Sequence, residues 1–332
     1  MQSRRSHFSV IAGFLALSGA CLAPGFWARG ASATAAVSAG AVLPARPLQP
    51  QGSVLFIGNS FLYGSGSAVR FYRAASVTDL NGSGVGGVPA LFKAFAAQAG
   101  LDFTVSLETA SGQGLDYHFA QKADVIGQPW DRVVMLGYSL LDRAKPGNPA
   151  LLILSVKQVA DLLHRKNPLV DIRLIATWSR ADQVYPPAGH WHGQPIEQMG
   201  KDIRVAYDLA AAGTPYIRGI IPVGEAWNRA FQMGVADPNP YDGIAFGQVS
   251  LWTFDHYHPS TYGYYLEALM IFGDLTGLDP RSLGKGERTA FELGLSGAQA
   301  TALQQVAFDE LSAMKNRGPL RTFTPAPLAK SG

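Results

Sequence analysis

Cysteine is almost absent from this sequence of 332 residues, because Cys21 is its only example. Cys21 lies in a segment, residues 1–33, that we expect to be removed from the mature protein. The mature chain would then have no thiol. That excludes disulfide bonds, thiol catalysis and thiolate coordination of a metal.

Residues near the amino terminus indicate an export signal. Arg4 and Arg5 precede the apolar run FSVIAGFLALSGACLA, which is too short to span a membrane comfortably. Ala31 and Ala33 form an A-x-A site, so we expect cleavage after Ala33. The run SRRSHF partly resembles a twin-arginine signal, and the sequence leaves both Sec and Tat export open. We expect a secreted or periplasmic protein with no integral membrane span after signal removal.

Net charge is also lacking in the mature chain. Removal of residues 1–33 lowers the count of Lys and Arg from 27 to 24, which equals the 24 Asp and Glu. No lysine or arginine cluster is left that would follow a phosphate backbone, so no nucleic-acid partner is expected. Only 15% of all residues are charged and 47% are hydrophobic, which is sufficient to bury a full core.

Five short apolar runs rich in β-branched residues predict strands. They begin at Ser53, Phe103, Arg132, Asp171 and Ile217. Segments with helical periodicity lie between several of them, at residues 88–100, 149–167 and 196–213. Parallel neighbours in a sheet require crossover connections of this kind. The pattern therefore predicts a three-layer α/β/α domain with a doubly wound parallel sheet of about five strands.

The order of these segments predicts four parts of the chain. They are an export signal, a Pro/Ala/Gly-rich tether, the α/β domain and a C-terminal helical extension, at residues 1–33, 34–50, 51–280 and 281–332. In the extension, a helical pattern over residues 287–314 is interrupted near Gly294. It restarts with Ser296 as the expected N-cap.

Two polar motifs fall where a doubly wound sheet carries its functional loops, beyond the carboxyl ends of strands. The first strand runs into Gly-Asn-Ser-Phe, which places Ser60 directly after it. Far along the chain, Asp255 and His258 precede a helix that we expect to begin at Pro259. At that spacing the carboxylate can accept the Nδ1 hydrogen while Nε2 faces outward. A serine nucleophile needs such a base, although a capped helix with a solvated histidine also explains the second motif.

Together, Gly-Asn-Ser-Phe and Asp-x-x-His-Pro-Ser-x-x-Gly resemble the SGNH/GDSL hydrolase superfamily, in particular its bacterial branch with a Gly-Asn-Ser-Phe first block. The resemblance covers residues 54–273. It implies a flavodoxin-like sheet, Ser60 as nucleophile, His258 as base and Asp255 as the residue that orients the base. The implied function is an exported serine esterase that cleaves an acyl ester through an acyl-enzyme, without a cofactor. An acyltransferase with the same triad and a catalytically poor glycan-binding member are the alternatives.

The resemblance also implies an oxyanion hole made by the Ser60 amide, a glycine amide of the second block and an asparagine side chain of the third. The second block corresponds best to ASGQGLDYH, where Gly112 is the expected donor and Gly114 the alternative. The third block departs from the pattern, since GYSLLD has no asparagine. Three residues are candidates for the missing donor: Asn59, Tyr138 and Ser139.

Aromatic and polar residues in the same loops bear on the substrate. The candidate substrate-binding residues are Asn59, His118, Tyr138 and Trp178. Aromatic rings with polar neighbours suit sugar faces, which favours a small-molecule or glycan acyl ester such as an O-acylated carbohydrate. Core packing of Trp178 and an ordinary surface position for His118 explain these residues equally well.

Two stretches have partial metal-binding patterns. Residues 79–84, DLNGSG, open like a calcium loop, but Ala90 stands where a bidentate glutamate belongs. His190 and His192 have no third ligand for catalytic zinc. The expected chemistry needs no metal, and the sequence leaves calcium binding at residues 79–84 open.

Overall fold

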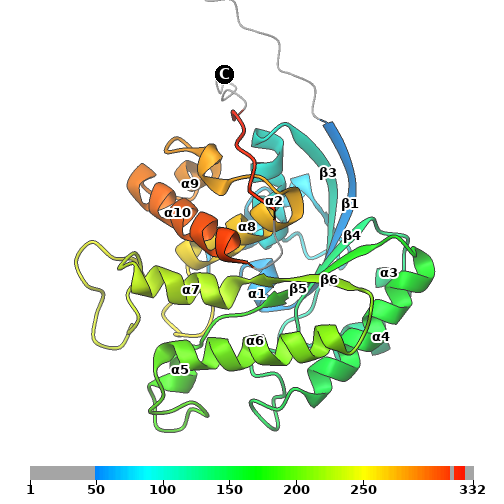
Figure 1. The fold of residues 1–332 in the computed structure, drawn as a ribbon, viewed down its shortest axis with the longest axis horizontal. Helices are drawn as coiled ribbons and strands as arrows, with labels where there is room; N and C mark the ends of the chain where they lie inside the picture. The colour runs from blue at the N-terminus through cyan, green and yellow to red at the C-terminus, as the bar shows by residue number, and fades with distance from the viewer. Residues whose placement is uncertain (1–48, 315–317, 326–332) are drawn as a thin grey trace, which may run out of the picture. The chain divides into compact units, whose positions relative to one another are not determined.

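A parallel six-stranded sheet is the centre of the fold in the computed structural model, which describes residues 49–314 and 318–325 (Figure 1). The strands are β1 (Gln49–Gly58), β2 (Thr78–Asp79), β3 (Leu101–Thr109), β4 (Arg132–Met135), β5 (Asp171–Ala176) and β6 (Ile217–Pro222). Their order is β2-β3-β1-β4-β5-β6, and every neighbouring pair is parallel. The predicted α/β class is confirmed.

Strand β2 is the difference from the five strands expected. It pairs at the sheet edge with β3, through Thr78 and Asp79 only. Two residues are too few to produce an alternating or apolar pattern, so this strand had no sequence signal. Without β2, the order of the other five strands is that of flavodoxin-like sheets.

Helices cover both faces of the sheet. One layer contains α2 (Gly87–Gln98), α8 (Thr261–Thr276) and α10 (Gly297–Ala313), and the other contains α3 (Leu115–Ile126), α4 (Ala150–Lys166) and α6 (Ile196–Ala212). Helix α7 (Val223–Gln232) contacts both α6 and α8. The short helices are α1 (Ser60–Tyr63), α5 (Ala181–Val184), α9 (Arg288–Glu292) and the 3₁₀ turns η1 (Ala68–Phe71), η2 (Ala74–Ser76) and η3 (Pro280–Leu283). This arrangement gives the three layers predicted.

Burial explains why the strands are apolar without alternation. Val54, Leu55, Phe56 and Ile57 are consecutive in β1 and all have no exposed surface. A parallel sheet covered on both faces requires apolar side chains in both directions. The core therefore lies between the sheet and each helical layer.

The C-terminal helices begin and end at the residues that the sequence indicated. Helix α9 ends before Gly294, whose φ is 81°, in the left-handed region. Helix α10 starts after Ser296, which forms a capping box with Gln299. Helix α10 packs on α8, so the extension is part of the same unit as the sheet.

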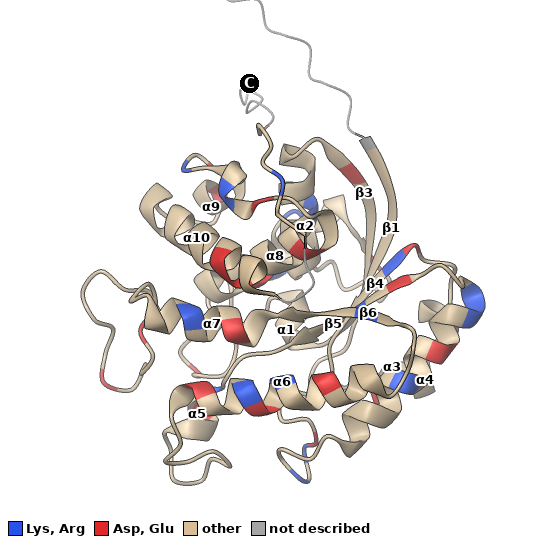
Figure 2. Cartoon of the chain, in the orientation of Figure 1, with Lys and Arg blue, Asp and Glu red and all other residues tan. Residues whose placement is uncertain are grey.

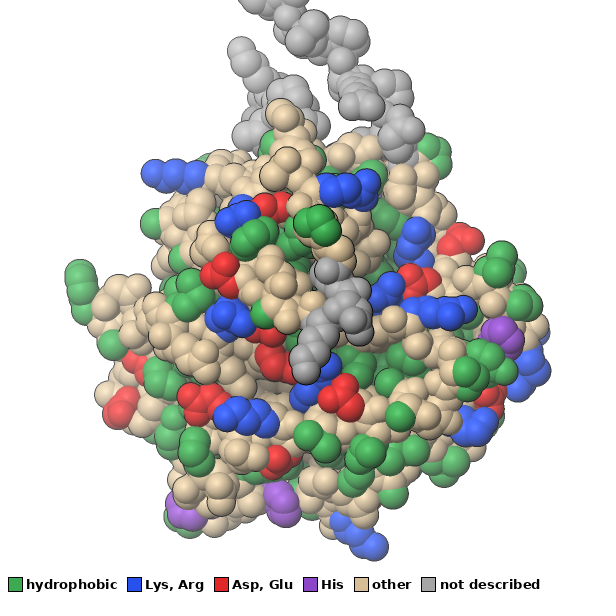
Figure 3. All heavy atoms as spheres, in the orientation of Figure 1, with side chains coloured by type: hydrophobic (Ala, Val, Ile, Leu, Met, Phe, Trp, Pro, Cys, Tyr) green, Lys and Arg blue, Asp and Glu red, His purple; other side chains and the backbone are tan. Residues whose placement is uncertain are grey.

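The predicted export signal and most of the predicted tether, residues 1–48, lie outside the described residues. Among the helices in the described residues, none is long and apolar enough to cross a membrane. Figure 2 shows charges of both signs on α6 and α7, and the Arg204–Glu225 ion pair joins these helices at 2.7 Å. Lys or Arg side chains lie beside Asp or Glu side chains over the face shown in Figure 3.

Candidate active site

Ser60 lies at the carboxyl end of β1, where it is the first residue of α1. The helix starts here because the side chain of Asn59 caps it by accepting a hydrogen bond from the Phe61 amide at 3.2 Å. It stops after one turn at Gly64, which adopts a φ of 83°. Ser60 itself is only 3% exposed, so the surrounding residues cover almost all of its surface.

The hydroxyl of Ser60 faces the imidazole of His258. His258 Nε2 lies 2.9 Å from Ser60 Oγ, and His258 Nδ1 lies 2.6 Å from Asp255 Oδ2. An ionised carboxylate only accepts hydrogen bonds, so Nδ1 carries the hydrogen and Nε2 can accept the hydrogen of the serine hydroxyl. The structure thus brings the three residues together at distances that allow proton transfer.

A tight turn before α8 holds the carboxylate of Asp255. Its Oδ1 atom accepts hydrogen bonds from Thr253 Oγ1 at 2.7 Å, from the His258 amide at 2.9 Å and from the Tyr257 amide at 3.0 Å. Within the turn, His256 has a φ of 56°, an uncommon value for a residue with a side chain. Burial raises the pKa of Asp255, but the bonds from His258, Thr253 and the two amides outweigh it and lower the pKa to about 2. The carboxylate is therefore ionised at neutral pH.

Helix α8 also holds the segment that carries the serine. The hydroxyl of Tyr264 lies 3.0 Å from the carbonyl oxygen of Ser60 and 3.0 Å from that of Ser65. Tyr264 has no exposed surface, and burial is the main cause that raises its pKa well above its usual value. It therefore acts as a neutral donor to the backbone of α1.

The loop between β3 and α3 brings Gly112 to the site. Residues 110–113 form a turn closed by the Gln113 amide and the Ala110 carbonyl at 3.2 Å. Gly112 takes the third position of this turn with a φ of 64°, which favours glycine. At Gly114 the reason for glycine is steric, since a Cβ atom there would lie 2.4 Å from the ring of Tyr138. No acceptor in the described residues takes the amide hydrogens of Ser60 and Gly112.

The side chain of Asn59 is fully engaged by the protein backbone. Its Nδ2 atom donates to the carbonyl oxygens of Gln113 at 2.9 Å and Gly137 at 3.1 Å, while Oδ1 accepts from Phe61. A side-chain amide has two hydrogens to donate, and both are used. Asn59 therefore has no hydrogen left for a substrate oxyanion, which corrects its assignment as a candidate donor.

Ser139 and Arg180 meet at the carboxyl ends of β4 and β5. Arg180 Nη1 donates to Ser139 Oγ at 3.2 Å, so the hydroxyl hydrogen of Ser139 is free to point elsewhere. Arg180 is itself fixed by two bonds to Asp182, at 2.9 and 2.6 Å, and its guanidinium carbon lies 3.6 Å from the centroid of the Tyr257 ring. Ser139 is 7% exposed.

A small pocket of about 210 Å³ lies next to the candidate triad. Its lining residues are Asn59, Gly112, Tyr138, Ser139, Leu140, Arg143, Arg180 and Tyr257. Two of them are direct neighbours in sequence of Ser60 and His258. The pocket is formed by loops that follow β1, β3, β4 and β5 and by the turn before α8, and it spans the β1–β4 pair where the strand order reverses. Such a position is the usual binding site of this type of sheet.

His118 and Trp178 do not line this pocket, which corrects their assignment as substrate-binding residues. Both side chains are fully buried. His118 pairs through Nδ1 with the buried Glu108 and so ties α3 to the end of β3. Trp178 stacks between the rings of Phe61, at 4.4 Å, and Trp227, at 4.7 Å. Tyr138 and Asn59, by contrast, both line the pocket.

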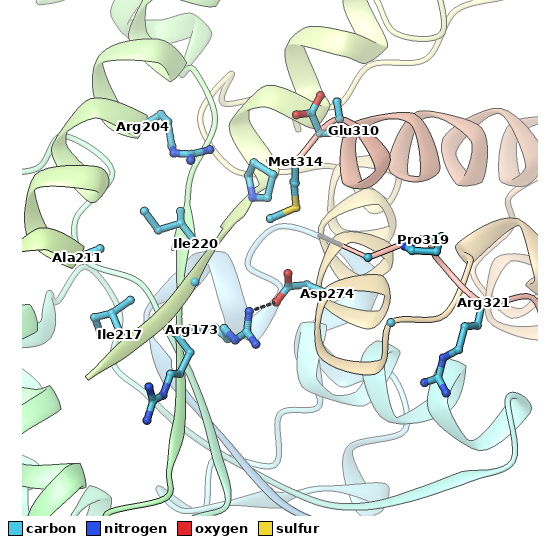
Figure 4. Close-up of a pocket in the computed structure, with 16 residues that line it drawn as sticks. Arg173, Arg204, Ala211, Ile217, Ile220, Asp274, Glu310, Met314, Pro319 and Arg321 are labelled. Atoms are coloured by element: carbon cyan, nitrogen blue, oxygen red, sulfur yellow. Dashed lines mark ion pairs between the residues drawn. The ribbon is translucent and has the colours of Figure 1, made fainter. Parts of the chain in front are cut away.

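A larger cavity of about 910 Å³ lies along β6 and away from these residues (Figure 4). Arg173 faces Asp274 there at 3.4 Å, and Arg204 also lines the cavity while paired with Glu225 and Asp208. None of the predicted site residues contributes to its lining. We therefore do not connect this cavity with Ser60.

The partial calcium motif has another role in the structure. Asp79 accepts hydrogen bonds from the amides of Asn81, at 3.0 Å, and Ser83, at 2.8 Å, so its carboxylate shapes its own loop. In the described part of the chain, no group of three or more histidine, cysteine or acidic residues could hold a metal ion.

Some residues at the site had little or no sequence signal. Thr253 and Tyr264 act through hydrogen bonds to Asp255 and to the backbone of Ser60. Arg143 reaches the pocket from an exposed loop. Only the closeness of Thr253 and Tyr264 to the Asp-x-x-His motif could have indicated the first two.

Comparison with family models and with curated proteins finds no match. Among solved structures, a DUF4886 family protein from Bacteroides uniformis is 17% identical, with a TM-score of 0.54 over 82% of this chain and 98% of that chain. A protein described as a GDSL-like lipase from Parabacteroides merdae is 18% identical, with a TM-score of 0.49 over 70% and 99% of the two chains. An acetylxylan esterase from Geobacillus stearothermophilus is 16% identical, with a TM-score of 0.46 over 70% and 97%. The protein therefore shares the α/β fold of the DUF4886 family protein, with a parallel sheet covered by helices on both faces.

Proposed function

We propose that the protein is an exported serine hydrolase that cleaves an acyl ester, with Ser60 as nucleophile, His258 as general base and Asp255 as the residue that orients the base. One observation carries this proposal: the chain from Ser60 Oγ through His258 to Asp255 has distances of 2.9 and 2.6 Å. A histidine–aspartate pair with a purely structural role would not need a serine hydroxyl at the other nitrogen of the imidazole. A nucleophile, a base and an orienting carboxylate in this order are the parts that acyl transfer needs.

In the first half of the reaction, Ser60 Oγ attacks the ester carbonyl carbon while its proton passes to His258 Nε2. The imidazolium that forms is stabilised by Asp255, whose lowered pKa keeps it ionised. The tetrahedral intermediate collapses, the ester C–O bond breaks and the alcohol leaves with the proton from His258. Water then attacks the acyl-enzyme by the same route and releases the acid together with free Ser60.

The negative charge on the tetrahedral intermediate requires hydrogen-bond donors. The amides of Ser60 and Gly112 are free to donate, and Gly114 is the less suitable alternative because Tyr138 packs directly against it. We assign the third donor to the hydroxyl of Ser139. Its oxygen accepts from Arg180, which leaves the hydroxyl hydrogen for the substrate and polarises it by a charged neighbour.

Hydrolysis of a short-chain aryl ester by the purified protein, beside the Ser60→Ala variant, tests the proposal. We expect the variant to lose about 10⁴-fold to 10⁶-fold in kcat. Equal, slow release of product by both proteins would contradict a Ser60 nucleophile and favour a glycan-binding protein without turnover. Added alcohols distinguish an acyltransferase from a hydrolase, because an acyltransferase would convert the alcohols into acylated products.

The export route is a second, separate part of the proposal. It rests on the twin arginine and the apolar run of residues 1–33. Expression of the full chain in a bacterium should yield a processed protein outside the cytoplasm. Replacement of Arg4 and Arg5 by lysine should block the export if the Tat route is used and leave it intact if the Sec route is used. A full-length, unprocessed protein in the cytoplasm would contradict export.

A further inference from the structure

The pocket beside Ser60 carries cationic side chains but no acidic ones. Two of its lining residues, Arg143 and Arg180, are arginines, and none is aspartate or glutamate. A volume of about 210 Å³ corresponds to about seven times the roughly 30 Å³ occupied by a water molecule. The space therefore suits a small polar group of several heavy atoms rather than a long acyl chain.

The two arginines differ in how their charge is balanced. Arg180 forms a bidentate ion pair with Asp182 and stacks on Tyr257, so its charge is compensated. Arg143 has no carboxylate partner among the described residues. It donates from Nη1 to the carbonyl oxygen of Gly112 at 3.0 Å, and its guanidinium lies 5.9 Å from the centroid of the Tyr138 ring. One uncompensated positive charge thus remains at the pocket.

Arg143 also lies against Gly112. A Cβ atom built on Gly112 would lie 3.6 Å from Arg143 Nη1 and 3.9 Å from Nη2. The guanidinium therefore covers the glycine that we propose as an oxyanion donor. Its bond to the Gly112 carbonyl uses one of five N–H donors, which leaves others for a ligand.

Three carboxylates act on residues that line the pocket, and none of the three lines it itself. Asp182 is paired with Arg180. Asp142 accepts from the amides of Ala144, at 2.8 Å, and Lys145, at 3.1 Å. Asp116 acts on Tyr138, where it adds to the effect of burial in raising the pKa of the phenol. A ligand in the pocket would meet the guanidinium of Arg143 before any of these groups.

We propose that Arg143 makes this pocket a subsite for a carboxylate, so that the preferred substrate is an anionic acyl ester. The inference rests on the proposed function, because it names the substrate class of the same site. The carboxylate can belong to the acyl group, as in the half-ester of a dicarboxylic acid, or to the alcohol, as in an acylated sugar acid. A guanidinium binds a carboxylate through two parallel hydrogen bonds, which a lysine cannot reproduce.

Matched pairs of esters test the proposal and separate the two sources. In the first pair, para-nitrophenyl hemisuccinate and para-nitrophenyl butyrate share the leaving group and the length of the acyl chain. In the second pair, an acetylated methyl glucuronoside and an acetylated methyl glucoside share the acetyl ester. We expect kcat/KM to be about tenfold higher for the anionic member of one pair, because its KM is lower. Added salt should reduce this preference.

Arg143→Met should abolish the preference, because it should lower kcat/KM for the anionic ester about tenfold more than for the neutral ester, while Arg143→Lys should keep part of the preference. Arg132→Met is the matched control. Arg132 also donates to a backbone carbonyl, that of Gln51 at 2.5 Å, and stacks on a ring, that of Phe103 at 5.4 Å, but at the other end of β4. This control should not change the preference.

Two outcomes would overturn the subsite. Equal loss on neutral and anionic esters in Arg143→Met would assign the guanidinium to the oxyanion instead. A preference for neutral esters in both pairs would exclude a carboxylate ligand. If the wild-type protein cleaves no ester, the proposed function fails, and calorimetric titration of Ser60→Ala with monomethyl succinate still tests the subsite. Binding that Arg143→Met removes would support it, and no binding to Ser60→Ala would overturn it.

Discussion

The side-chain amide of Asn59 donates a hydrogen bond to the carbonyl oxygen of Gly137 over 3.1 Å. This bond joins the end of β1 to the loop that follows β4. A second bond from the same nitrogen reaches the loop after β3, at Gln113. One side chain therefore fixes the three loops that surround Ser60, and its role is structural rather than catalytic.

Asn59→Ala should lower the free energy of unfolding by about 3 kcal/mol, because three hydrogen bonds of about 1 kcal/mol each are lost. Asn59→Asp should be at least as harmful, since its carboxylate would face the Gln113 and Gly137 carbonyl oxygens without a hydrogen to donate. Urea unfolding followed by circular dichroism measures both. A stable Asn59→Asp protein would show that these two bonds contribute little.

Ser139→Ala should lower kcat for ester hydrolysis by about 10² to 10³ with little change in KM, because an oxyanion donor acts mainly in the transition state. Ser139→Asn places an amide donor at the same position and should keep much of the activity. Steady-state kinetics on a neutral aryl ester provide the measurement. Full activity in Ser139→Ala would remove this hydroxyl from the oxyanion hole.

Asp255→Asn should lower kcat by about 10⁴, since the amide no longer holds the Nδ1 hydrogen of the base. The carboxylate also affects stability, because its pKa falls from 3.8 to about 2 on folding. A lowered acid pKa stabilises the fold above pH 3.8, and this stabilisation is lost as the pH falls towards 2. Unfolding measured from pH 2 to pH 6 should show a stability difference between wild type and variant that shrinks below pH 4. A constant difference would contradict the pKa shift.

Glu267→Met should stabilise the protein at pH 7. Glu267 is fully buried in α8, and neither carboxyl oxygen has a hydrogen-bond partner among the described residues. Burial raises its pKa well above the usual 4.5, so the folded protein keeps a proton that the unfolded chain releases. Wild-type stability should therefore decrease as the pH rises above 4.5, and the advantage of the variant should grow over the same range.

Glu267→Gln is the control for this effect. It removes the titration but keeps a buried polar group, so its stability should lose the pH dependence without the full gain of the methionine variant. Thermal unfolding at several pH values between 4 and 8 compares the three proteins. Parallel pH profiles for all three would show that Glu267 does not titrate as described.

The sequence predicted the parts of the fold and site that have local signals. The buried strands β1, β3, β4, β5 and β6 have apolar runs, and Ser296 has the spacing of a helix cap. Ser60, Asp255 and His258 stand in short motifs whose residue types and spacing suit the chemistry proposed for them. Such features were readable because a few neighbouring residues determine each of them.

Other features depend on which way a side chain points, and this is not a local property. Trp178 lies in the loop after β5 and His118 in the first turn of α3, yet both side chains turn inward, towards a ring stack and towards Glu108. Asn59 has its partners 54 and 78 positions away, on backbone carbonyls that any residue could provide. The role of Asn59 was therefore visible only once the loops were placed in space.

The hydrogen bond from the Tyr264 hydroxyl to the carbonyl oxygen of Ser60 couples motion at the site to the amino-terminal end of α8. His258 lies two residues before the cap of this helix, Ser260, and Tyr264 lies in its first turn, so the proposed nucleophile and the proposed base share one support. Fraying of this turn would release both at once. Hydrogen exchange of the amides at the start of α8 should thus accelerate at the same temperature at which the protein loses activity, before the sheet itself unfolds.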